Sequence, residues 1–470
     1  MMFSVFLRAV LIGKQIGSLW WHPHRGGSYE KLLSFFLIGL MLCFAFTGCS
    51  DKPKLDPDNP VTLTMWHVYG EQADSPMNRL IEEFNKTVGA EKGIIINVTL
   101  MSNASQIGQK LLDAQDEVPG VPSMPDLFFC HSSNAEELGV SNLLNWNDLF
   151  TEDELNNYVP EFLEDGKIGD VLAVFPVSKS THVLYVAGTQ FDRFAKDMDV
   201  SYDDLSTWDG FFSVAEKYYT WSSGKPFCAL DYPIRCVELN ALSKGAENFY
   251  TEDGWYDFDN PVFKESWMEF AQAISKGHIV VSDLYSNTMV MTGEVIAGIG
   301  SSASILYYND VITYPDNTTD PMNLQVVPLP KTKDADLLVT LAGVGLCSYK
   351  TTEQKAEAAA VFARYITEEA RNFEFVASTG YMPVNKGSFE KIKDYAFESK
   401  AYENLYTTLF EVNKTATAIR EPSFAGYYEK IYALYDRLRE MQPQLTERFA
   451  NGEDAAKLAA ETWELFRSIE

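Results

Sequence analysis

Trp66, His67 and Tyr69 are side chains suited to holding a flat polar ligand. They stand at the end of the alternating run 61–66, which predicts a β-strand, so they should lie at its carboxyl end. An aromatic ring with a polar edge can stack on the apolar face of a sugar while its indole or phenol group donates a hydrogen bond. We expect at least one of the three to contact a ligand. The alternative is that Trp66 is a core residue.

Two turns that carry short hydroxyl groups follow later strands. Ser132 and Ser133 come after a buried run that ends at Cys130, and Gly300 and Ser301 close a similar run further along. Short hydroxyls beside free backbone N–H groups could hold a hydroxyl or phosphate group of a ligand. A serine at either position could equally cap a helix, so both interpretations stay open.

Catalysis is not predicted by any motif in the chain. The sequence contains no nucleophile elbow, no His-Glu-x-x-His and no P-loop. His67, His131, His182 and His278 are scattered, and each is expected to be structural. A glycosidase needs two carboxyl groups, but such pairs must occur by chance among 66 acidic residues. We therefore expect a protein that is not an enzyme and that needs no cofactor and no metal ion.

The first half of the chain alternates strands and helices in the order that builds a parallel sheet. Strands are predicted at 61–66, 94–100 and 125–130, with amphipathic helices at 77–84 and 106–114 between them. Right-handed crossovers place all the strand carboxyl ends on one edge, where open α/β sheets bind ligands. The candidate residues of this half should therefore lie on one edge.

The second half repeats the theme, and its C-terminal part is mainly helical. The whole chain is therefore predicted to be a two-lobed α/β protein. Its predicted elements are strands at 170–176, 181–187, 294–300 and 324–328 and a helix at 208–218 capped by Ser206 or Thr207.

An apolar run at 32–46 is too short for a comfortable membrane span but suits the core of a signal peptide. It leads to small residues before Cys49, which resembles a bacterial lipobox, although Phe46 stands where leucine is usual. The resemblance implies that Cys49 is lipidated after removal of residues 1–48; the alternative is an uncleaved anchor. Residues 1–48 begin with a long preface, so we expect the true start to lie further along. Residues 49–60, rich in proline, predict a flexible spacer.

The formal net charge of −28 argues against nucleic acid or anionic lipid as a binding partner. The cysteines do not form a dense disulfide framework, and no CxxC spacing occurs. Cys228 and Cys236 are close enough to pair across a loop, but buried free thiols are at least as plausible.

Several segments, in this order, resemble the family of extracellular solute-binding proteins that serve ABC importers, in its sugar-binding cluster. Each motif is weak alone, but their order and spacing cover nearly all of residues 61–470. The matching segments are 176–192 with Leu184-Tyr185, where Val186-Ala187 departs from the family pattern, Thr207-Trp208-Asp209, 291–300, 326–330, 341–345, 356–368 and Thr379-Gly380-Tyr381 with Pro383.

The resemblance implies a periplasmic-binding-protein type II fold, with two α/β lobes, an interlobe cleft and a multi-strand hinge. One lobe would comprise 61–177 with 342–384, and the other 182–338 with 388–470. Hinge strands would fall near 177–181, 340–343 and 383–386.

Tyr185, Tyr381 and Arg420 match segments that line the cleft of the family. A cleft arginine could hold a phosphate or carboxylate through two hydrogen bonds. The alternative for Arg420 is an ion pair with Glu421 or a place at a helix end.

The function that the resemblance implies is that of a bacterial receptor outside the cytoplasm. It would bind a sugar or oligosaccharide and deliver it to the permease subunits of an ABC importer, tethered to the cell membrane by lipid. The Trp-His opening with Arg420 is similar to the glycerol-phosphate branch, so glycerol 3-phosphate or a related anionic polyol is the alternative ligand. A secreted glycan hydrolase is a more remote alternative. We expect a monomer that binds no nucleic acid.

Overall fold

The computed structural model describes residues 54–69, 75–100, 104–252, 254–283, 285–392, 394–397, 399–422, 424 and 426–469. All the elements described below belong to one compact unit, Leu55–Glu470. The predicted signal peptide and Cys49 lie outside the described residues.

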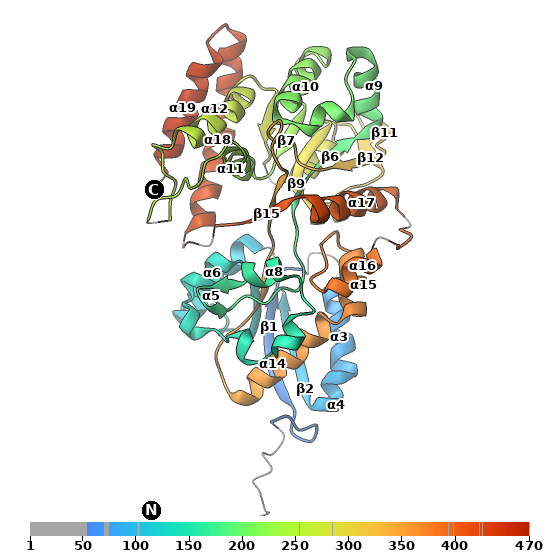
Figure 1. Cartoon of the computed structure of the whole chain (residues 1–470), viewed down its shortest axis with the longest axis vertical. Helices are drawn as coiled ribbons and strands as arrows, with labels where there is room; N and C mark the ends of the chain where they lie inside the picture. The colour runs from blue at the N-terminus through green and yellow to red at the C-terminus, as the bar shows by residue number, and fades with distance from the viewer. Residues whose placement is uncertain are drawn as a thin grey trace, which may run out of the picture. The chain divides into compact units, whose positions relative to one another are not determined.

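The first sheet has four strands in the order β14-β3-β1-β2, of which β1 and β2 are labelled in Figure 1. β1 (Val61–His67) pairs in parallel with β2 (Ile94–Leu100) and with β3 (Leu127–Cys130), which confirms the parallel sheet predicted from the sequence. β14 (Gly345–Ser348) runs antiparallel to β3 and enters from far along the chain. We call this sheet and its helices the first lobe.

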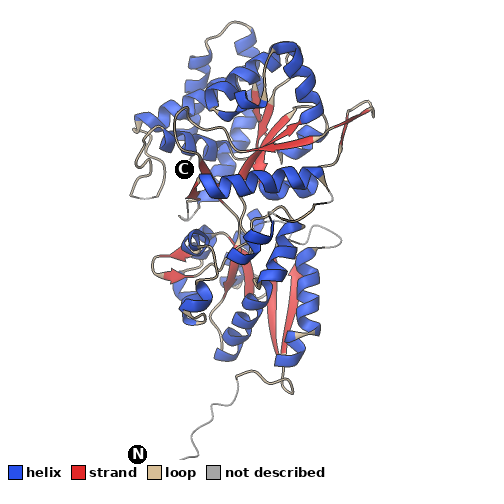
Figure 2. Ribbon diagram, turned by 45° about the vertical axis from the view of Figure 1, so that its right-hand side comes forward, coloured by secondary structure: helices blue, strands red, loops and turns tan. Residues whose placement is uncertain are grey.

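Helices flank the strands of this sheet (Figure 2). α3 (Pro76–Lys86) begins after Ser75, whose hydroxyl accepts a hydrogen bond from the backbone N–H of Asn78, and it buries Leu80 and Phe84 among its apolar residues. The other elements of this lobe are α4 (Val88–Lys92), α5 (Ala104–Gln115), α6 (Ser132–Glu137), α7 (Glu152–Leu155), α8 (Pro160–Asp165), β4 (Lys167–Ile168), β5 (Val171–Leu172), α14 (Glu353–Ile366), α15 (Glu369–Ala377) and α16 (Lys386–Ile392).

The strand predicted at 170–176 is wrong for most of its length. Only Val171 and Leu172 form a strand, in the short β4–β5 hairpin. Val174 and Phe175 are apolar residues buried outside any strand, and Phe175 makes a single bridge to Leu346. Burial alone therefore produced the strand-like pattern there.

The second sheet has five strands in the order β12-β6-β9-β7-β8 and belongs to the second lobe. β7 is parallel to β8 and β9, whereas β6 is antiparallel to β9 and β12. The predicted helix at 208–218 is confirmed as α10, and its cap is Thr207. The strands of the lobe are β6 (His182–Ala187), β7 (Cys228–Leu230), β8 (Ile279–Val281), β9 (Ala297–Ser301), β10 (Val311–Thr313), β11 (Thr319–Pro321), β12 (Leu324–Val327), β13 (Leu338–Leu341) and β15 (Thr417–Arg420). The helices are α9 (Gly188–Met198), α10 (Trp208–Trp221), α11 (Pro233–Ser243), α12 (Pro261–Ser275), α13 (Ser286–Met291), α17 (Lys400–Thr415), α18 (Tyr427–Ala450) and α19 (Ala455–Arg467).

Three chain segments lie side by side between the two sheets. Ser180 and Ala342 exchange backbone hydrogen bonds of 2.9 Å in both directions. Lys179 does the same with Met382, with N···O distances of 3.1 and 2.6 Å. The chain therefore crosses between the lobes in extended segments that pair with one another.

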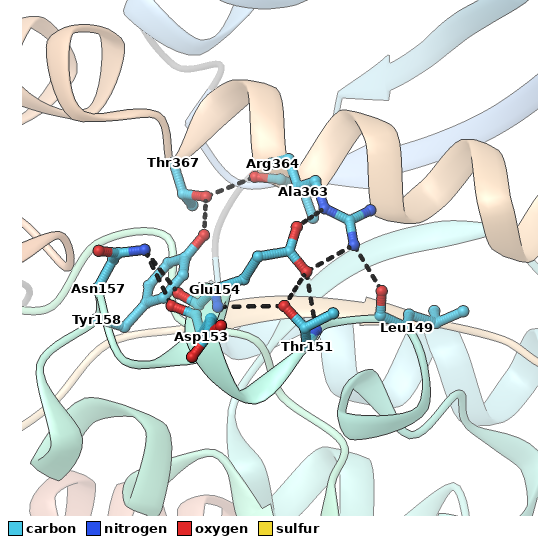
Figure 3. Close-up of polar contacts among 9 residues, drawn as sticks. All are labelled: Leu149, Thr151, Asp153, Glu154, Asn157, Tyr158, Ala363, Arg364 and Thr367. Carbon is cyan, nitrogen blue, oxygen red and sulfur yellow. Dashed lines mark hydrogen bonds and ion pairs between the residues drawn. The ribbon is translucent and has the colours of Figure 1, made fainter.

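A polar network fastens the outer part of the first lobe to α14 (Figure 3). Thr151 and Glu154 form a capping box at the start of α7. Arg364 of α14 donates to Oε1 of Glu154 at 2.6 Å and to the carbonyl of Leu149 at 2.6 Å. Beside it, the hydroxyls of Tyr158 and Thr367 lie 2.6 Å apart. The network fixes the segment that leads into α8, whose residues reach the interlobe site described below.

Among the described residues, no helix has the length and apolar character required to cross a bilayer. Cys228 and Cys236 are buried free thiols.

Candidate ligand-binding site

The carboxyl ends of the parallel strands in both sheets lie where the chain crosses between the lobes. In the second lobe, His182 follows directly after the 177–181 crossing segment and pairs with Ser301 at the carboxyl end of β9. In the first lobe, Gly345 follows the Ala342 crossing and pairs with Cys130 at the carboxyl end of β3. The loops after these strand ends therefore form the candidate site.

Tyr69 and Tyr381 belong to one aromatic cluster on the first lobe. The Tyr69 ring meets the rings of Phe129, Phe375 and Tyr381 edge to face, at centroid distances of 5.0, 5.5 and 6.0 Å. Its hydroxyl lies 3.4 Å from that of Ser178 in a crossing segment. Burial raises the pKa of both phenols, so both stay neutral. The structure thus brings together two residues predicted from distant parts of the sequence.

Trp66 and His67 are placed differently from Tyr69. Trp66 is only 2% exposed and packs in a core with Ile107 and Leu111 of α5, so the core interpretation fits it and its ring has no open face. Both ring nitrogens of His67 are engaged: Nε2 lies 2.9 Å from Oδ1 of Asn78, and Nδ1 accepts from the backbone N–H of Tyr69 at 3.2 Å. Burial lowers the pKa of His67 to about 4, so it is neutral. Its role is to hold the turn that carries Tyr69.

His131 lies at the carboxyl end of β3, just before α6, and contacts the second lobe directly. Its Nδ1 is 3.0 Å from the hydroxyl of Tyr428 in α18 and 3.8 Å from Oε2 of Glu421. Burial, assisted by the charge of Lys179, lowers the pKa of His131 to about 4. Sequence reasoning treated this histidine as structural and did not foresee its contact across the lobes.

Ser132 and Ser133 stand in the first turn of α6. Ser132 donates to the carbonyl of Asp165 at 3.2 Å. Ser133 is 3% exposed, and its hydroxyl oxygen has no hydrogen-bond partner in the structure. Neither hydroxyl caps the helix. The cap position is His131, and its side chain makes no cap bond.

On the second lobe, Gly300, Ser301 and Tyr185 shape the end of β9. A Cβ at Gly300 would lie 2.4 Å from Oδ2 of Asp231, so the backbone there approaches a carboxyl group closely. Ser301 caps the following short helix through the N–H of Ala303, and buried Tyr185 donates to the carbonyl of Ser302 at 2.7 Å. Ser301 and Tyr185 thus hold the turn in place through bonds within the lobe.

Asp231 is a buried carboxyl group at the carboxyl end of β7. It accepts from the hydroxyl of Ser282 at 2.8 Å and from the backbone N–H of Ser286 at 2.5 Å. Burial raises the pKa of Asp231 to about 7, although the hydrogen bonds from both serines oppose this. The group is therefore partly protonated near neutral pH and can serve as a donor or an acceptor.

Further tyrosines surround these strand ends. Tyr232 stacks on His182 at 4.9 Å with an interplanar angle of 11°. Tyr285 and Tyr307 are 49% and 46% exposed, among the most exposed large side chains of the described residues. Burial is the largest cause of the raised pKa of Tyr381, and electrostatic interaction with the phenols of Tyr69, Tyr307 and Tyr285 raises it further. The geometry agrees, because a Cβ at Gly380 would lie 2.7 Å from the carbonyl oxygen of Ser302, in the short helix of the second lobe that ends at Tyr307.

Arg420 does not pair with Glu421. Its Nη1 donates to the carbonyl of Glu164 at the end of α8, at 2.6 Å, which links the second lobe to the first. Its own carbonyl accepts from Arg235 at 3.1 Å. The guanidinium group therefore already serves a contact between the lobes.

Lys179 carries a buried positive charge at the crossing. It is 1% exposed, and its Nζ lies 2.5 Å from Oδ2 of Asp165. Because the pair is neutral as a whole, it presents no net charge to a ligand. Among the described residues, no group of His, Cys, Asp or Glu is arranged to hold a metal ion.

The tyrosines of the second lobe, including those of α18, were not predicted from the sequence. Tyr428 and Tyr432 follow a helical spacing, and such a stripe is usually core. Tyr285 directly precedes α13 and Tyr307 ends the short helix after β9, and neither belongs to a recognisable motif. Their position just after β8 and β9 was the available signal, once those strands were known.

Residues 79–404 match the family of bacterial extracellular solute-binding proteins. The chain belongs to this family. Solute-binding proteins of this family act outside the cytoplasm, so the location predicted for this chain is confirmed at that level. No curated protein sequence matches this solute-binding protein significantly.

Solved structures share the fold of this solute-binding protein at low sequence identity. The cyclic alpha-maltosyl-1,6-maltose binding protein from Arthrobacter globiformis has a TM-score of 0.62 at 16% identity, over 87% of this chain and 99% of that one. UgpB from Mycobacterium tuberculosis, in complex with glycerophosphocholine, has a TM-score of 0.61 at 16% identity, over 87% and 98%. Lmo0181 from Listeria monocytogenes, in complex with cycloalternan, has a TM-score of 0.64 at 13% identity, over 87% and 98%. These likenesses confirm the predicted two-lobed α/β fold.

Proposed function

We propose that this protein binds a neutral sugar or oligosaccharide between its two lobes and delivers it to the permease of an ABC importer. The observation that carries the proposal is the grouping of tyrosines from both lobes around Tyr381. Phenol rings offer stacking faces for sugar rings and hydroxyls for their polar edges. Tyr69 and Tyr381 would supply the faces on the first lobe, and Tyr232, Tyr285 and Tyr307 those on the second.

A neutral ligand agrees with the charges at the site. Lys179 is paired with Asp165, and Arg420 donates to a backbone carbonyl of the first lobe. An anionic ligand would have to compete with these partners for the two cations. Two of the fold neighbours are named as binding maltose-type or alternan-type sugars, which supports this class of ligand.

A glycerol phosphodiester or glycerol 3-phosphate is the second candidate ligand. Its support is the likeness to UgpB, solved with glycerophosphocholine. For this ligand, Arg420 would have to exchange the carbonyl of Glu164 for a phosphate oxygen. We also propose that Cys49 is lipidated, that residues 49–60 tether a monomeric receptor to the membrane, and that the bound ligand leaves unchanged.

Isothermal titration calorimetry of the full chain in detergent would test the proposal. The panel would contain malto-oligosaccharides and xylo-oligosaccharides of increasing length, glycerophosphocholine and glycerol 3-phosphate. We expect at least one neutral oligosaccharide to bind, and Tyr381→Ala to weaken that binding about tenfold or more through loss of a stacking face. Tyr395→Ala is the matched control, because Tyr395 is 49% exposed and packs on Phe373 outside the site.

Two results would contradict the proposal. Binding of glycerophosphocholine without any neutral sugar would favour the second candidate. An unchanged dissociation constant for Tyr381→Ala would remove the tyrosine cluster from the site. Chromatography of the recovered oligosaccharide checks the absence of turnover, because a shortened product would identify a hydrolase instead.

A further inference from the structure

A small group of hydrogen bonds joins the lobes independently of the three crossing segments. Besides the bonds from Tyr402 and Tyr406 of α17 to backbone carbonyls near Tyr381, they come from the part of the second lobe between the end of β15 and the start of α18. Arg420 donates to the carbonyl of Glu164, and the backbone N–H of Gly426 donates to Oε1 of Glu137 in α6 at 2.6 Å. The third contact is that of Tyr428 with His131.

The third contact is a directed chain of hydrogen bonds. The hydroxyl of Tyr428 donates its one proton to Oε2 of Glu421 at 2.7 Å. Its oxygen must therefore accept from Nδ1–H of His131 at 3.0 Å, which sets the tautomer of that imidazole. The two rings also contact each other, with centroids 4.5 Å apart. We call His131, Tyr428 and Glu421 the interlobe latch.

The latch is shielded from water, which strengthens its hydrogen bonds. The side chains of His131 and Glu421 are only 18% and 16% exposed. In such surroundings a hydrogen bond to a carboxylate is stronger than one between neutral groups in water. Burial raises the pKa of Glu421, against the opposing charge of Arg235.

The second-lobe side of the latch is anchored firmly. Arg235 and Glu238 of α11 form a fully buried ion pair, and Arg235 also donates to the carbonyls of Ile419 and Arg420. The hydroxyl of Tyr250 donates to Glu238 at 2.8 Å. Glu421 follows this anchored strand end directly, so it cannot follow the first lobe if the lobes separate. Opening of the lobes must therefore break the latch.

We propose that the interlobe latch sets the ligand affinity of this protein by stabilising the approach of the two lobes before any ligand binds. This inference rests on the proposed function, because it concerns the affinity of that same site. A ligand that requires both lobes binds with an apparent dissociation constant equal to the intrinsic one divided by the fraction of molecules with the lobes together. His131, Tyr428 and Glu421 are thus positioning residues, and loss of the latch lowers that fraction for every ligand alike.

Tyr428→Phe tests the latch because it removes one oxygen and keeps the ring. We expect the dissociation constant to rise about tenfold, by the same factor for every oligosaccharide that the wild-type protein binds. Tyr435→Phe is the matched control on the same helix, since its buried hydroxyl makes no hydrogen bond to the first lobe. It should leave every dissociation constant unchanged.

Hydrogen exchange of the ligand-free protein gives a second readout that does not depend on any ligand. The amide of Gly426 donates across the lobes, so peptides that contain it should exchange faster in Tyr428→Phe than in wild type and in Tyr435→Phe. Should Tyr428→Phe fail to fold, Glu137→Gln weakens the neighbouring charge-assisted bond and should show the same behaviour with a rise of about threefold.

The proposal is overturned by either of two results. Unchanged exchange at Gly426 in the ligand-free variant would show that the latch does not hold the lobes together. A loss of affinity that differs between ligands would show that Tyr428 contacts the ligand itself. If the wild-type protein binds no sugar, the proposed function fails, yet the exchange measurement still decides whether the latch exists.

Discussion

Replacement of Lys179 by methionine tests the role of the buried ion pair at the crossing. Lys179 lies in the segment that pairs with Met382, it is 1% exposed, and its Nζ is 2.5 Å from Oδ2 of Asp165. Methionine keeps most of the length and apolar surface of the lysine stem. The substitution therefore removes mainly the charge and leaves Asp165, itself 12% exposed, without its cationic partner.

The expected cost follows from the burial of both partners. Breaking a buried pair on one side typically costs about 3–5 kcal/mol, because an uncompensated charge remains inside the protein. A typical unfolding free energy is about 5–15 kcal/mol, so the loss should be plain in a urea titration followed by circular dichroism. Adding Asp165→Asn removes the orphaned charge, so the double variant should be more stable than Lys179→Met alone.

Lys167→Met is the matched control for this experiment. Lys167 pairs with Glu164 at a similar distance of 2.6 Å, but the two side chains are 36% and 60% exposed. Water screens such a pair, so its loss should cost less than about 1 kcal/mol. Equal effects of the Lys179 and Lys167 substitutions would refute the argument from burial. A double variant no more stable than Lys179→Met would refute the argument from the orphaned charge.

Two further predictions concern stability. Trp66→Ala should lower the unfolding free energy by about 3–5 kcal/mol, because Trp66 fills a core site and is only 2% exposed. The folded fraction of this variant should keep its ligand affinity. A loss of affinity at normal stability would show instead that Trp66 contacts the ligand. Burial holds the pKa of His131 at about 4 and that of His182 at about 3, below the usual 6.5, so between pH 6.5 and 4 the unfolded chain binds protons that the folded one does not. The unfolding free energy should therefore fall by about 2 kcal/mol per such histidine from pH 7 to pH 5. The raised pKa of Asp231 opposes this fall, because the folded protein then binds a proton that the unfolded chain does not. Urea titrations at both pH values check the prediction, and higher stability at pH 5 would contradict it.

The parallel part of the first sheet was predictable because each step was local. β1, β2 and β3 each show a strand pattern, and the helices between them show an apolar stripe. The chirality of crossovers then fixes which edge carries the strand ends. The antiparallel β14 was not foreseen as a member of this sheet, because its pairing with β3 joins residues far apart in sequence.

The candidate site was predicted only in part for the same reason. Tyr69 and Tyr381 each stand in a recognisable segment, and both lie in the aromatic cluster. In the sequence, Trp66 and Tyr185 looked as suitable for the site as Tyr69 and Tyr381, but both are buried in cores. A shift of one residue along a strand turns a side chain to the opposite face of the sheet. The contact of His131 with Tyr428 depends on the packing of two lobes, which no local pattern encodes.

The late arrival of β14 bears on the order in which the chain can mature. The first lobe begins at β1, yet its fourth strand and α14 lie beyond residue 344, after the whole five-stranded sheet of the second lobe. Residues 182–327 can thus assemble their sheet while the first lobe still lacks an edge. During synthesis and export, β3 would have an unpaired neighbour position that invites wrong pairing until residue 345 emerges. A chain truncated before β14 should therefore aggregate through the first lobe, and helper proteins that delay folding would act chiefly on that half.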